Sequence, residues 1–310
     1  MKSRRLVLWN PNARQSDSSE ALLARISEDE NTVVAILEDS DSAARAFDEH
    51  GAGAHVIIAG GDGTVHRALN YAVEHNPDST YSILPLGTGN DFAAALGQTK
   101  SPWEAWAAIE NDELKLRCVD IARLVLDGKP RFFFNTVAAG ISAEYSEKVT
   151  SEEKRLLGPL TYLKGSFDVI VNQRSFPIRY ALEDGEWNDI QIANCFVSNS
   201  SACGGGIQIA PGAEVDDNLL HFVMYHEMNS VDRMLLITDY LAGRYKENEA
   251  VSIHQCQKVR LQSKSPLPLS IDGEIEHARE IEIELIPHRL DILVPKSERL
   301  AEESIPTLPL

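Results

Sequence analysis

The sequence predicts an α/β domain followed by an antiparallel β domain, and three observations support this. Short β-branched runs alternate with helical patterns in the first third of the chain, which is typical of a parallel sheet with crossover helices. From Leu114 the β runs are longer and are separated by Asp-Gly pairs, which favour hairpin turns. The chain has 310 residues, which is long for one domain. We therefore expect an α/β domain over residues 1–115, a β-sandwich over 116–295 and a tail over 296–310 that could dock on the first domain.

The first domain should alternate strands with helices. Four apolar, β-branched runs predict strands at residues 6–9, 32–37, 55–59 and 81–84. Ser19 and Ser40 can cap helices over residues 19–28 and 40–51, and a third helix is expected over 64–76. This order predicts a doubly wound sheet whose loops gather at the strand ends.

The second domain should be built mainly from hairpins. Asp127-Gly128 and Asp184-Gly185 each lie between apolar runs and predict turns. Helical patterns interrupt these runs at residues 143–148, 159–171 and 231–242. An antiparallel β-sandwich or barrel is the natural inference.

The charge balance restricts the ligands that the protein can bind. Asp plus Glu total 47 and Lys plus Arg total 29, so the formal net charge is −18. This charge disfavours a nonspecific nucleic-acid-binding protein, because the negative field repels phosphate backbones. An anionic ligand must be held by backbone amides, a few placed cations or a metal ion. The four cysteines form no close pair, so we expect reduced thiols. No run is apolar enough for a secretion signal or a membrane span, so we expect a cytoplasmic protein.

Residues 60–64 read GGDGT and lie between an apolar strand and a helix that Thr64 begins. Gly60, Gly61 and Gly63 would let the backbone approach a phosphate while amides at the helix N-terminus point toward it. Asp62 would repel that phosphate unless it holds a cation or accepts a proton from an attacking hydroxyl. The alternative is a tight turn in which Asp62 caps the helix, and for a glycine cluster alone this is favoured.

Residues 85–91 read PLGTGND and repeat the arrangement after the next strand. The two loops should converge at the carboxyl edge of one parallel sheet and form one nucleotide pocket. There Thr88, Asn90 and the backbone amides of Gly87 and Gly89 would contact phosphates, and Asp91 could place a metal ion or the nucleotide. Without the first loop, Asn90-Asp91 would be an ordinary helix cap.

The pair GGDGT and PLGTGNDFA resembles the diacylglycerol kinase and sphingosine kinase superfamily of lipid kinases. GGDGT alone is also similar to NAD kinases and phosphofructokinases, whereas PLGTGND is typical of the lipid branch. The likeness continues in NP at 10–11, FNTVAAGISAE at 134–144, LGPLTYL at 157–163, SNSSACGGGIQIAPGA at 198–213 and IDGE at 271–274. The resemblance implies a phosphofructokinase/NAD kinase-like nucleotide-binding domain, a β-sandwich and an active site between them.

The resemblance also implies the reaction and its ligands. ATP would give its γ-phosphoryl group to a lipid hydroxyl with the help of Mg²⁺, most like the soluble bacterial diacylglycerol kinases. Asn10, Pro11 and Arg14 would join the two glycine loops in binding the nucleotide. The acceptor would be diacylglycerol or a related lipid alcohol, taken from the inner face of a membrane to which the protein binds peripherally.

The IDGE segment places two carboxylates on either side of a glycine. In an extended chain, positions two apart face the same side, so Asp272 and Glu274 could act on one site. From these residues alone another β-turn is favoured. The resemblance implies instead that Asp272 is the general base and that Glu274 belongs to the metal network, so the magnesium candidates are Asp62, Asp91 and Glu274.

Several segments depart from the family pattern, among them the loop after Asn10-Pro11, which lacks the usual glycine, and Ala94, where a basic residue is common. After GGDGT the family commonly shows Asn-Glu, whereas this chain has His66-Arg67. Some bacterial members also have a structural magnesium loop that ends in Asp-Gly; here Asp216 and Asp217, the weaker metal candidates, are followed by Asn218.

Two questions stay open at this point. Residues 147–174 combine basic and apolar side chains, which fits a helix on a membrane surface as well as a core-packing helix with a solvated basic face. Two alternatives to the lipid kinase also remain: a kinase of a soluble hydroxyl compound such as NAD, and a catalytically silent nucleotide- or lipid-binding regulator.

Two further expectations concern the fold and the assembly. The three glycines at 204–206 are expected to have a role in the fold, and a homodimer is one option for the assembly.

Overall fold

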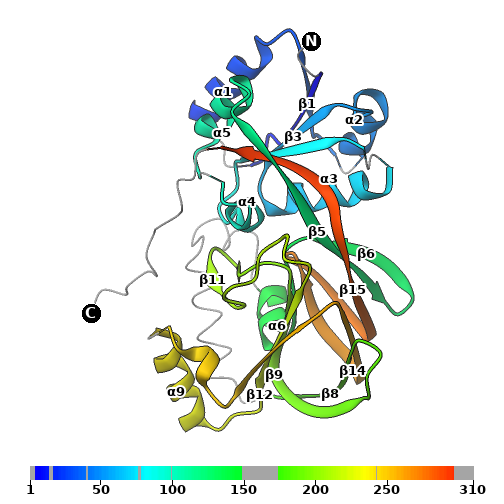
Figure 1. The fold of residues 1–310 in the computed structure, drawn as a ribbon, viewed down its shortest axis with the longest axis vertical. Helices are drawn as coiled ribbons and strands as arrows, with labels where there is room; N and C mark the ends of the chain where they lie inside the picture. Colours follow the sequence, from blue (N-terminus) through cyan, green and yellow to red (C-terminus); the bar gives the residue numbers. More distant parts are fainter. Residues whose placement is uncertain are drawn as a thin grey trace.

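The computed structural model describes residues 4–13, 17–39, 41–75, 78–98, 100–148, 174–241 and 243–296. An α/β half and a β-rich half follow one another along the longest axis of the molecule (Figure 1). The antiparallel β half and the α/β half match the predicted fold class.

The α/β half is a parallel sheet covered on both faces. Its strands lie in the order β2-β1-β3-β4 and are β1 (Arg5–Trp9), β2 (Thr32–Ile36), β3 (His55–Gly60) and β4 (Thr80–Pro85). Its helices are α1 (Asp17–Ser27), α2 (Ser42–His50), α3 (Asp62–His75), α4 (Asp91–Ala95) and α5 (Pro102–Glu110). Alternate residues of β1 enter two apolar clusters, Leu6 and Leu8 in one and Val7 and Trp9 in the other. The middle of β1 is therefore a continuous apolar run, because both faces of the sheet are buried.

The β half is antiparallel and encloses an apolar core of its own. Its strands are β5 (Leu114–Leu126), β6 (Lys129–Phe133), β7 (Thr136–Gly140), β8 (Phe176–Leu182), β9 (Asn188–Ser198), β10 (Ala202–Cys203), β11 (Ile207–Gln208), β12 (Leu220–His226), β13 (Val251–Cys256), β14 (Lys258–Ile271) and β15 (Glu274–Pro295). Its helices are α6 (Ile141–Lys148), α9 (Ser230–Leu241) and the short 3₁₀ helix η1 (Tyr245–Glu247).

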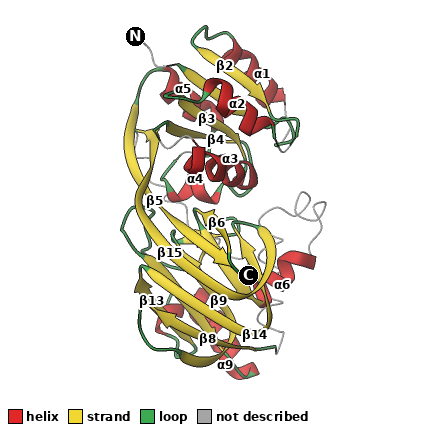
Figure 2. Ribbon diagram, turned by 90° about the vertical axis from the view of Figure 1, so that its right-hand side faces the viewer, coloured by secondary structure: helices red, strands yellow, loops and turns green. Residues whose placement is uncertain are grey.

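Two long strands, β5 and β15, run through both halves (Figure 2). The end of β15 returns to the α/β half, where Asp291 and Ile292 pair in parallel with Thr80 and Tyr81 of β4. The sheet is therefore continuous from one half to the other, an arrangement that the sequence-based division at residues 115 and 116 does not include. The division into domains at residues 115 and 116 remains a proposal, in which β5 and β15 connect the two domains.

The predicted elements of the α/β half are present, with shifts at their ends. The third helix begins at Asp62 rather than Thr64, because the carbonyl of Gly61 already accepts the amides of Thr64 and Val65, at 2.9 and 3.1 Å. Helices α4 and α5 were not predicted, although the side chain of Ser101 caps α5 by accepting the amide of Glu104.

The predicted turn at Asp127-Gly128 is present, and the one predicted at Asp184-Gly185 lies one residue earlier, at Glu183-Asp184. Asp127 and Gly128 both have positive φ and join β5 to β6, as a two-residue hairpin requires. Several expectations lie outside the described residues, namely the Ser40 cap, a helix over residues 159–171 and the tail from residue 297. No helix of the described residues is long and apolar enough to cross a membrane.

Candidate active site

The candidate site lies where loops of the two halves meet. The loop between β3 and α3 and the loop between β4 and α4 leave the carboxyl ends of neighbouring parallel strands. The amide of Leu86 donates to the carbonyl of Gly60 at 3.1 Å, so these loops continue the pairing of the strands. From the β half come the turn between β14 and β15 and the glycines between β10 and β11. The structure thus brings both glycine motifs and the IDGE segment together.

Close packing explains most of the motif glycines. A Cβ atom on Gly60 would lie 2.5 Å from the Cβ of Thr64, and one on Gly89 would lie 2.8 Å from Oδ2 of Asp62. A Cβ atom on Gly63 would meet nothing within 4 Å. Gly63 is therefore the glycine whose small size leaves open space at the start of α3, where helix amides favour an anion.

Asn10 braces the first glycine loop from the end of β1. Its Nδ2 donates to Oγ1 of Thr64 at 2.7 Å, and its Oδ1 accepts the amide of Asn12 at 2.9 Å. The side chain of Asn10 is thus directed at the protein rather than toward open solvent. The nucleotide-binding roles predicted for Asn10 and the adjacent Pro11 remain predictions, and Arg14 lies outside the described residues.

Asn90 has a similar bracing role in the second loop. Its side-chain amide closes a ring with Gly87, accepting the Gly87 amide at 2.9 Å and donating to the Gly87 carbonyl at 2.8 Å. These bonds hold Asn90 in the left-handed region at φ 53°. Thr88 and Gly89 at the loop tip are exposed, so they remain the candidates for direct phosphate contact.

Asp62 and Asp91 form an acidic pair at the mouths of the two loops. Burial raises the pKa of Asp62, and burial together with the charge of Asp62 raises the pKa of Asp91 to about 6. Oδ1 of Asp62 accepts the amide of Phe92 at 3.3 Å. Oδ1 of Asp91 accepts the amides of Gly205 and Gly206 at 2.9 and 3.1 Å.

This acidic pair fits a magnesium ion in its charge and in its number of ligands. Two partly desolvated carboxylates that repel one another are stabilised by a divalent cation. Magnesium in nucleotide sites typically takes one or two carboxylates, with water and phosphate oxygens as the other ligands. The described residues contain no cluster of three or more His, Cys, Asp or Glu side chains that could hold a metal ion. An ion at Asp62 and Asp91 would therefore need water or phosphate oxygens as further ligands.

Asp272 points into the protein although it lies in a turn. Asp272 and Gly273 have φ of 45° and 93° and form a two-residue hairpin between β14 and β15. The Asp272 carboxylate is 6% exposed and accepts the amides of Phe134, Asn135 and Thr136 at 2.8, 3.1 and 2.8 Å. The turn interpretation is right for the backbone, and it does not exclude a buried carboxylate at the meeting of the two halves.

His66 connects the two carboxylates of the IDGE segment. Its Nδ1 lies 3.0 Å from Oδ2 of Asp272, and its Nε2 lies 3.9 Å from Oε2 of Glu274. The same Glu274 oxygen lies 3.7 Å from Nη1 of Arg131. The reason given above for Asp272 and Glu274 sharing a site was therefore wrong: Asp272 is in a turn rather than in an extended chain, and the two side chains meet through His66.

The electrostatics of His66 reflect these neighbours. Burial disfavours the charged ring, but the hydrogen bond and the charge of Asp272 outweigh it and raise the pKa of His66 above its ordinary value. In the sequence, His66 stands out only as a departure from the family pattern. Its position four residues after Asp62, one helical turn into α3, was the available signal.

The three glycines of residues 204–206 have a more specific role than was predicted. Two of their amides bind Asp91, so this segment of the β half contacts the second loop of the α/β half. All three have positive φ, which suits glycine. The sequence offered the glycine run itself as a signal, but its partner lies 114 residues earlier in the chain.

The weaker metal candidates have other partners. Oδ2 of Asp216 accepts Nε of Arg117 at 2.9 Å, and a second guanidinium nitrogen binds Oδ1. Asp217 accepts the amides of Glu214 and Leu219 within its own loop. A structural ion at Asp216 and Asp217 remains a prediction, and an arginine already neutralises one of its two carboxylates.

Known proteins resemble the chain over nearly its whole described length. The family profile "Diacylglycerol kinase catalytic domain" matches residues 4–123, and the profile "YegS C-terminal NAD kinase beta sandwich-like domain" matches residues 135–294. A relative from Chromohalobacter salexigens named "Probable lipid kinase YegS-like" is 32% identical over 80% of this chain and 78% of its own. A relative from Staphylococcus carnosus named "Diacylglycerol kinase" is 24% identical over 80% of this chain and 78% of its own.

Solved structures show the same fold. A structure from Bacillus anthracis has a TM-score of 0.77 and 24% identity, and covers 94% of both chains. A second one from that organism, named as a diacylglycerol kinase, has a TM-score of 0.70 and 21% identity, and covers 94% of this chain and 97% of its own.

Proposed function

The chain belongs to the YegS-like lipid kinases of the diacylglycerol kinase family, and on this premise we propose that it transfers the γ-phosphoryl group of ATP to the hydroxyl of diacylglycerol or a related lipid alcohol. The observation that carries the proposal is the buried carboxylate of Asp272, which the β half presents to α3, the helix that follows the first glycine loop. A carboxylate in that place suits an acceptor that must lose a proton.

The proposed step is an in-line displacement. The acceptor hydroxyl oxygen forms a bond to the γ-phosphorus of ATP, the bond from that phosphorus to the bridging β,γ oxygen breaks, and ADP leaves. Asp272 takes the proton of the hydroxyl, so charge and atoms balance. Most of the rate gain in such reactions comes from positioning and from neutralising charge on the phosphoryl group.

Magnesium would be held by Asp62 and Asp91. Glu274, the third candidate, lies instead near His66 and Arg131, and the described residues contain no cluster of three such ligands. When bound, the ion neutralises charge on the phosphate oxygens. The amides at the start of α3 and the open space beside Gly63 suit the phosphates themselves. Asn10 braces the start of α3 through Thr64, and Asn90 braces the neighbouring loop through Gly87.

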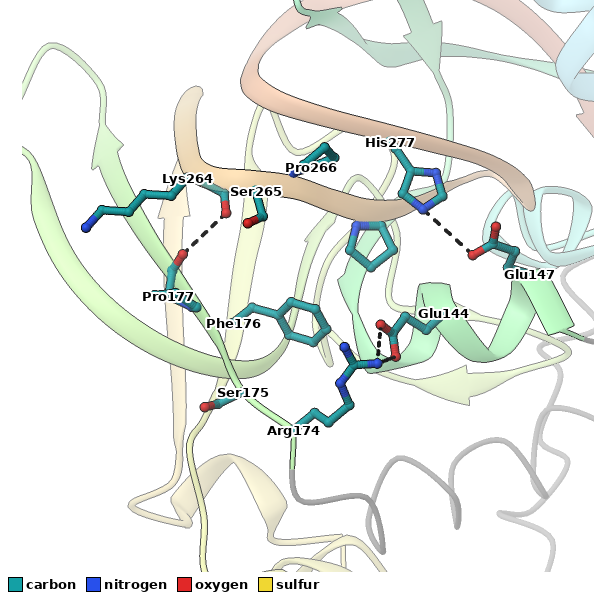
Figure 3. A pocket seen from close by; sticks show the side chains of 12 residues that line it. Glu144, Glu147, Arg174, Ser175, Phe176, Pro177, Lys264, Ser265, Pro266 and His277 are labelled. Atoms are coloured by element: carbon teal, nitrogen blue, oxygen red, sulfur yellow. Dashed lines mark hydrogen bonds and ion pairs between the residues drawn. The ribbon is translucent and has the colours of Figure 1, made fainter.

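We further propose that the acceptor lipid lies along the β14–β15 hairpin. A cavity of about 320 Å³ opens beside this hairpin, a size within the usual range for small-molecule sites (Figure 3). Phe176, Pro177, Pro266 and Pro268 give it an apolar wall. Its charged lining residues are Lys264, Glu147 and the ion pair of Arg174 with Glu144.

The position of this cavity suits a lipid whose hydroxyl reaches Asp272. Pro268 and His277 line the cavity and pair with each other across the hairpin. Pro268 lies four residues before Asp272, which corresponds to roughly 13 Å along an extended strand. An acceptor could therefore place its hydroxyl at Asp272 and its apolar part beside the cavity wall.

We also propose that the lipid is taken from a membrane surface, with the protein bound peripherally at the inner face. Most of the basic, apolar segment predicted to bind the bilayer, residues 149–173, lies outside the described residues. Among the described residues, α9 exposes Val231, Met234 and Leu235. Their spacing puts these apolar side chains on one face of the helix, which suits a membrane surface.

The test is phosphoryl transfer from labelled ATP with magnesium to a panel of micellar lipids, with NAD and water as comparison acceptors. We expect a labelled lipid with the wild-type protein, none with Asp272→Asn, and wild-type yield with Asp189→Asn, a matched control at an exposed position of β9. Label in NAD alone would replace the lipid proposal with a soluble-substrate kinase. ATP binding without transfer to any acceptor would make the protein a regulator.

A further inference from the structure

His66 and Asp272 are the two ends of a contact between the halves of the molecule. His66 lies on α3, in the α/β half, and Asp272 in the β14–β15 turn, 206 residues later, with 3.0 Å between Nδ1 and Oδ2. Both side chains are buried, at 7% and 6% exposure. The contact is therefore shielded from water, where a charge-assisted hydrogen bond is at its strongest.

The acceptor sites of Asp272 are all in use. Oδ1 accepts the amides of Asn135 and Thr136, and Oδ2 accepts the amide of Phe134 and Nδ1 of His66. A carboxylate offers about four lone-pair positions, so an incoming hydroxyl can bind only beside or in place of one of these donors. The three amides belong to one backbone segment of the β half, and His66 is the single donor among these four that comes from the α/β half.

The ring of His66 is itself held in one orientation. Because a carboxylate only accepts, Nδ1 carries the proton of this hydrogen bond. Nε2 faces Nδ2 of Asn70 at 3.3 Å, and Asn70 is fixed by two bonds to the backbone of Phe132 at 3.1 Å. The ring also packs edge-on against Phe134, with 5.9 Å between centroids.

The helix that carries His66 begins in the GGDGT loop. Asp62 and Gly63 form its first turn, and His66 follows four residues after Asp62, about 6 Å along the helix axis. The helix whose N-terminus is the proposed phosphate site therefore also contacts Asp272, the proposed base.

We propose that His66 is a positioning residue for phosphoryl transfer, which holds the Asp272 carboxylate in a fixed place relative to the GGDGT end of α3. The inference rests on the proposed role of Asp272. Because transfer requires the donor phosphorus, the acceptor oxygen and the base to be aligned, a loose carboxylate lowers the rate of the step more than the affinity for either substrate.

Three substitutions of His66 separate this role from simple packing. His66→Asn places an amide nitrogen where Nδ1 lies, His66→Gln moves that nitrogen one bond further out, and His66→Phe keeps the ring without a donor. His75→Phe is the matched control, since His75 lies on the same helix, exposed and stacked on Tyr71 at 4.1 Å. All variants are compared at a temperature where each is fully folded, as judged by thermal unfolding.

We expect His66→Phe to lower kcat at least roughly tenfold with the KM values for ATP and lipid within about twofold, because a loss of 1.4 kcal/mol of transition-state stabilisation gives that factor. We expect His66→Asn to regain most of kcat, His66→Gln to regain less, and His75→Phe to match the wild type. If His66→Phe does not fold, the comparison of Asn with Gln decides. A wild-type kcat in His66→Phe, or equal kcat in Asn and Gln, overturns the inference.

The failure of this inference can be told apart from failure of the proposed function. If the wild-type protein labels no lipid, the proposed function fails, and the His66 variants are then compared on ATP hydrolysis, in which water replaces the lipid hydroxyl. The same order of kcat values is expected there. Equal hydrolysis by the wild type and His66→Phe would reject the positioning role regardless of the acceptor.

Discussion

A Cβ atom built on Gly87 would lie 2.5 Å from the Cα atom of Gly61, so the backbones of the two glycine loops are in direct contact. The same added atom would lie 2.7 Å from Oδ1 of Asn90, which closes the second loop. Gly63, two residues after Gly61, has open space instead. The glycines of one motif therefore differ: Gly61 packs against the other loop, and Gly63 borders open space, where we propose that a phosphate binds.

Gly87→Ala and Gly63→Ala should separate these purposes. We expect Gly87→Ala to lower the free energy of unfolding by about 1–3 kcal/mol, because the added methyl group overpacks the loop contact. Gly63→Ala should leave stability unchanged or raise it by up to about 1 kcal/mol, because alanine suits a helix better than glycine. Denaturant unfolding measures both.

Although Gly63→Ala should not destabilise the protein, it should weaken ATP binding. Its methyl group would occupy the space proposed for a phosphate, so we expect its Kd for ATP to rise at least roughly tenfold, a loss of about 1.4 kcal/mol. Wild-type ATP affinity in Gly63→Ala would remove the start of α3 from the phosphate site.

Asp272→Asn should affect both turnover and stability. An amide keeps one oxygen, so its NH₂ group would face amide donors that now have no acceptor. We expect a loss of about 1–3 kcal/mol in the free energy of unfolding, the usual cost of an unsatisfied buried group, together with loss of phosphoryl transfer. Activity is compared at a temperature where the variant is folded, and unchanged stability would show that these amides find other partners.

The contrast between Asp272 and the glycine loops shows what the sequence could predict. Strand-loop-helix order and the two glycine motifs are local patterns, so the parallel sheet and the convergence of its loops followed from them. From the residues alone, IDGE was better explained as a turn, and the backbone agrees. The direction of the Asp272 side chain depends on amides near residue 135, which are far away in sequence.

The same reason explains the other omissions. His66 and Gly205 act through partners 206 and 114 residues away, and a single sequence does not indicate such pairings. The return of β15 to β4 is equally non-local. Helix α5, by contrast, carried a local signal in Ser101-Pro102 with Glu104 two residues later, which is a standard helix start.

Asp91 should make stability depend on pH when magnesium is absent. Its pKa is about 6 in the folded protein, against an ordinary value of 3.8, because it is buried and close to Asp62. The stability that this group contributes is fully present below about pH 4 and is lost as the pH rises to about 6, since the unfolded chain releases the proton first. Asp91→Asn has no such titration, so its melting temperature should gain on that of the wild type across this window.

Magnesium should reverse that difference. At neutral pH we expect the ion to raise the melting temperature of the wild type more than that of Asp91→Asn, because a carboxylate is lost in the variant. Asparagine can still accept the amides of Gly205 and Gly206 through its oxygen, so the contact between the halves is kept. Equal shifts in both proteins would remove Asp91 from the metal site.

Arg117 and Asp216 should behave as a plain ion pair. The two side chains are 20% and 26% exposed, and we expect Asp216→Asn to lower the free energy of unfolding by up to about 1 kcal/mol. In an Asp91→Asn background, a chelator should then have the same effect on stability whether or not Asp216→Asn is also present. A remaining chelator effect that Asp216→Asn abolishes would establish an ion at the Asp216 loop.

The cavity beside the β14–β15 hairpin predicts a substrate-specific defect. Phe176 and Tyr180 both lie on β8 and pack against the sandwich core, but Phe176 lines the cavity and Tyr180 does not. Phe176→Ala should raise the KM for the lipid at least several-fold with the KM for ATP unchanged, since removing an aromatic wall weakens the apolar contact on which lipid binding would depend. Tyr180→Ala should lower the melting temperature while leaving both KM values near those of the wild type. If both variants change the lipid KM equally, the effect arises from the stability of the sandwich, and the acceptor must bind elsewhere on the β half.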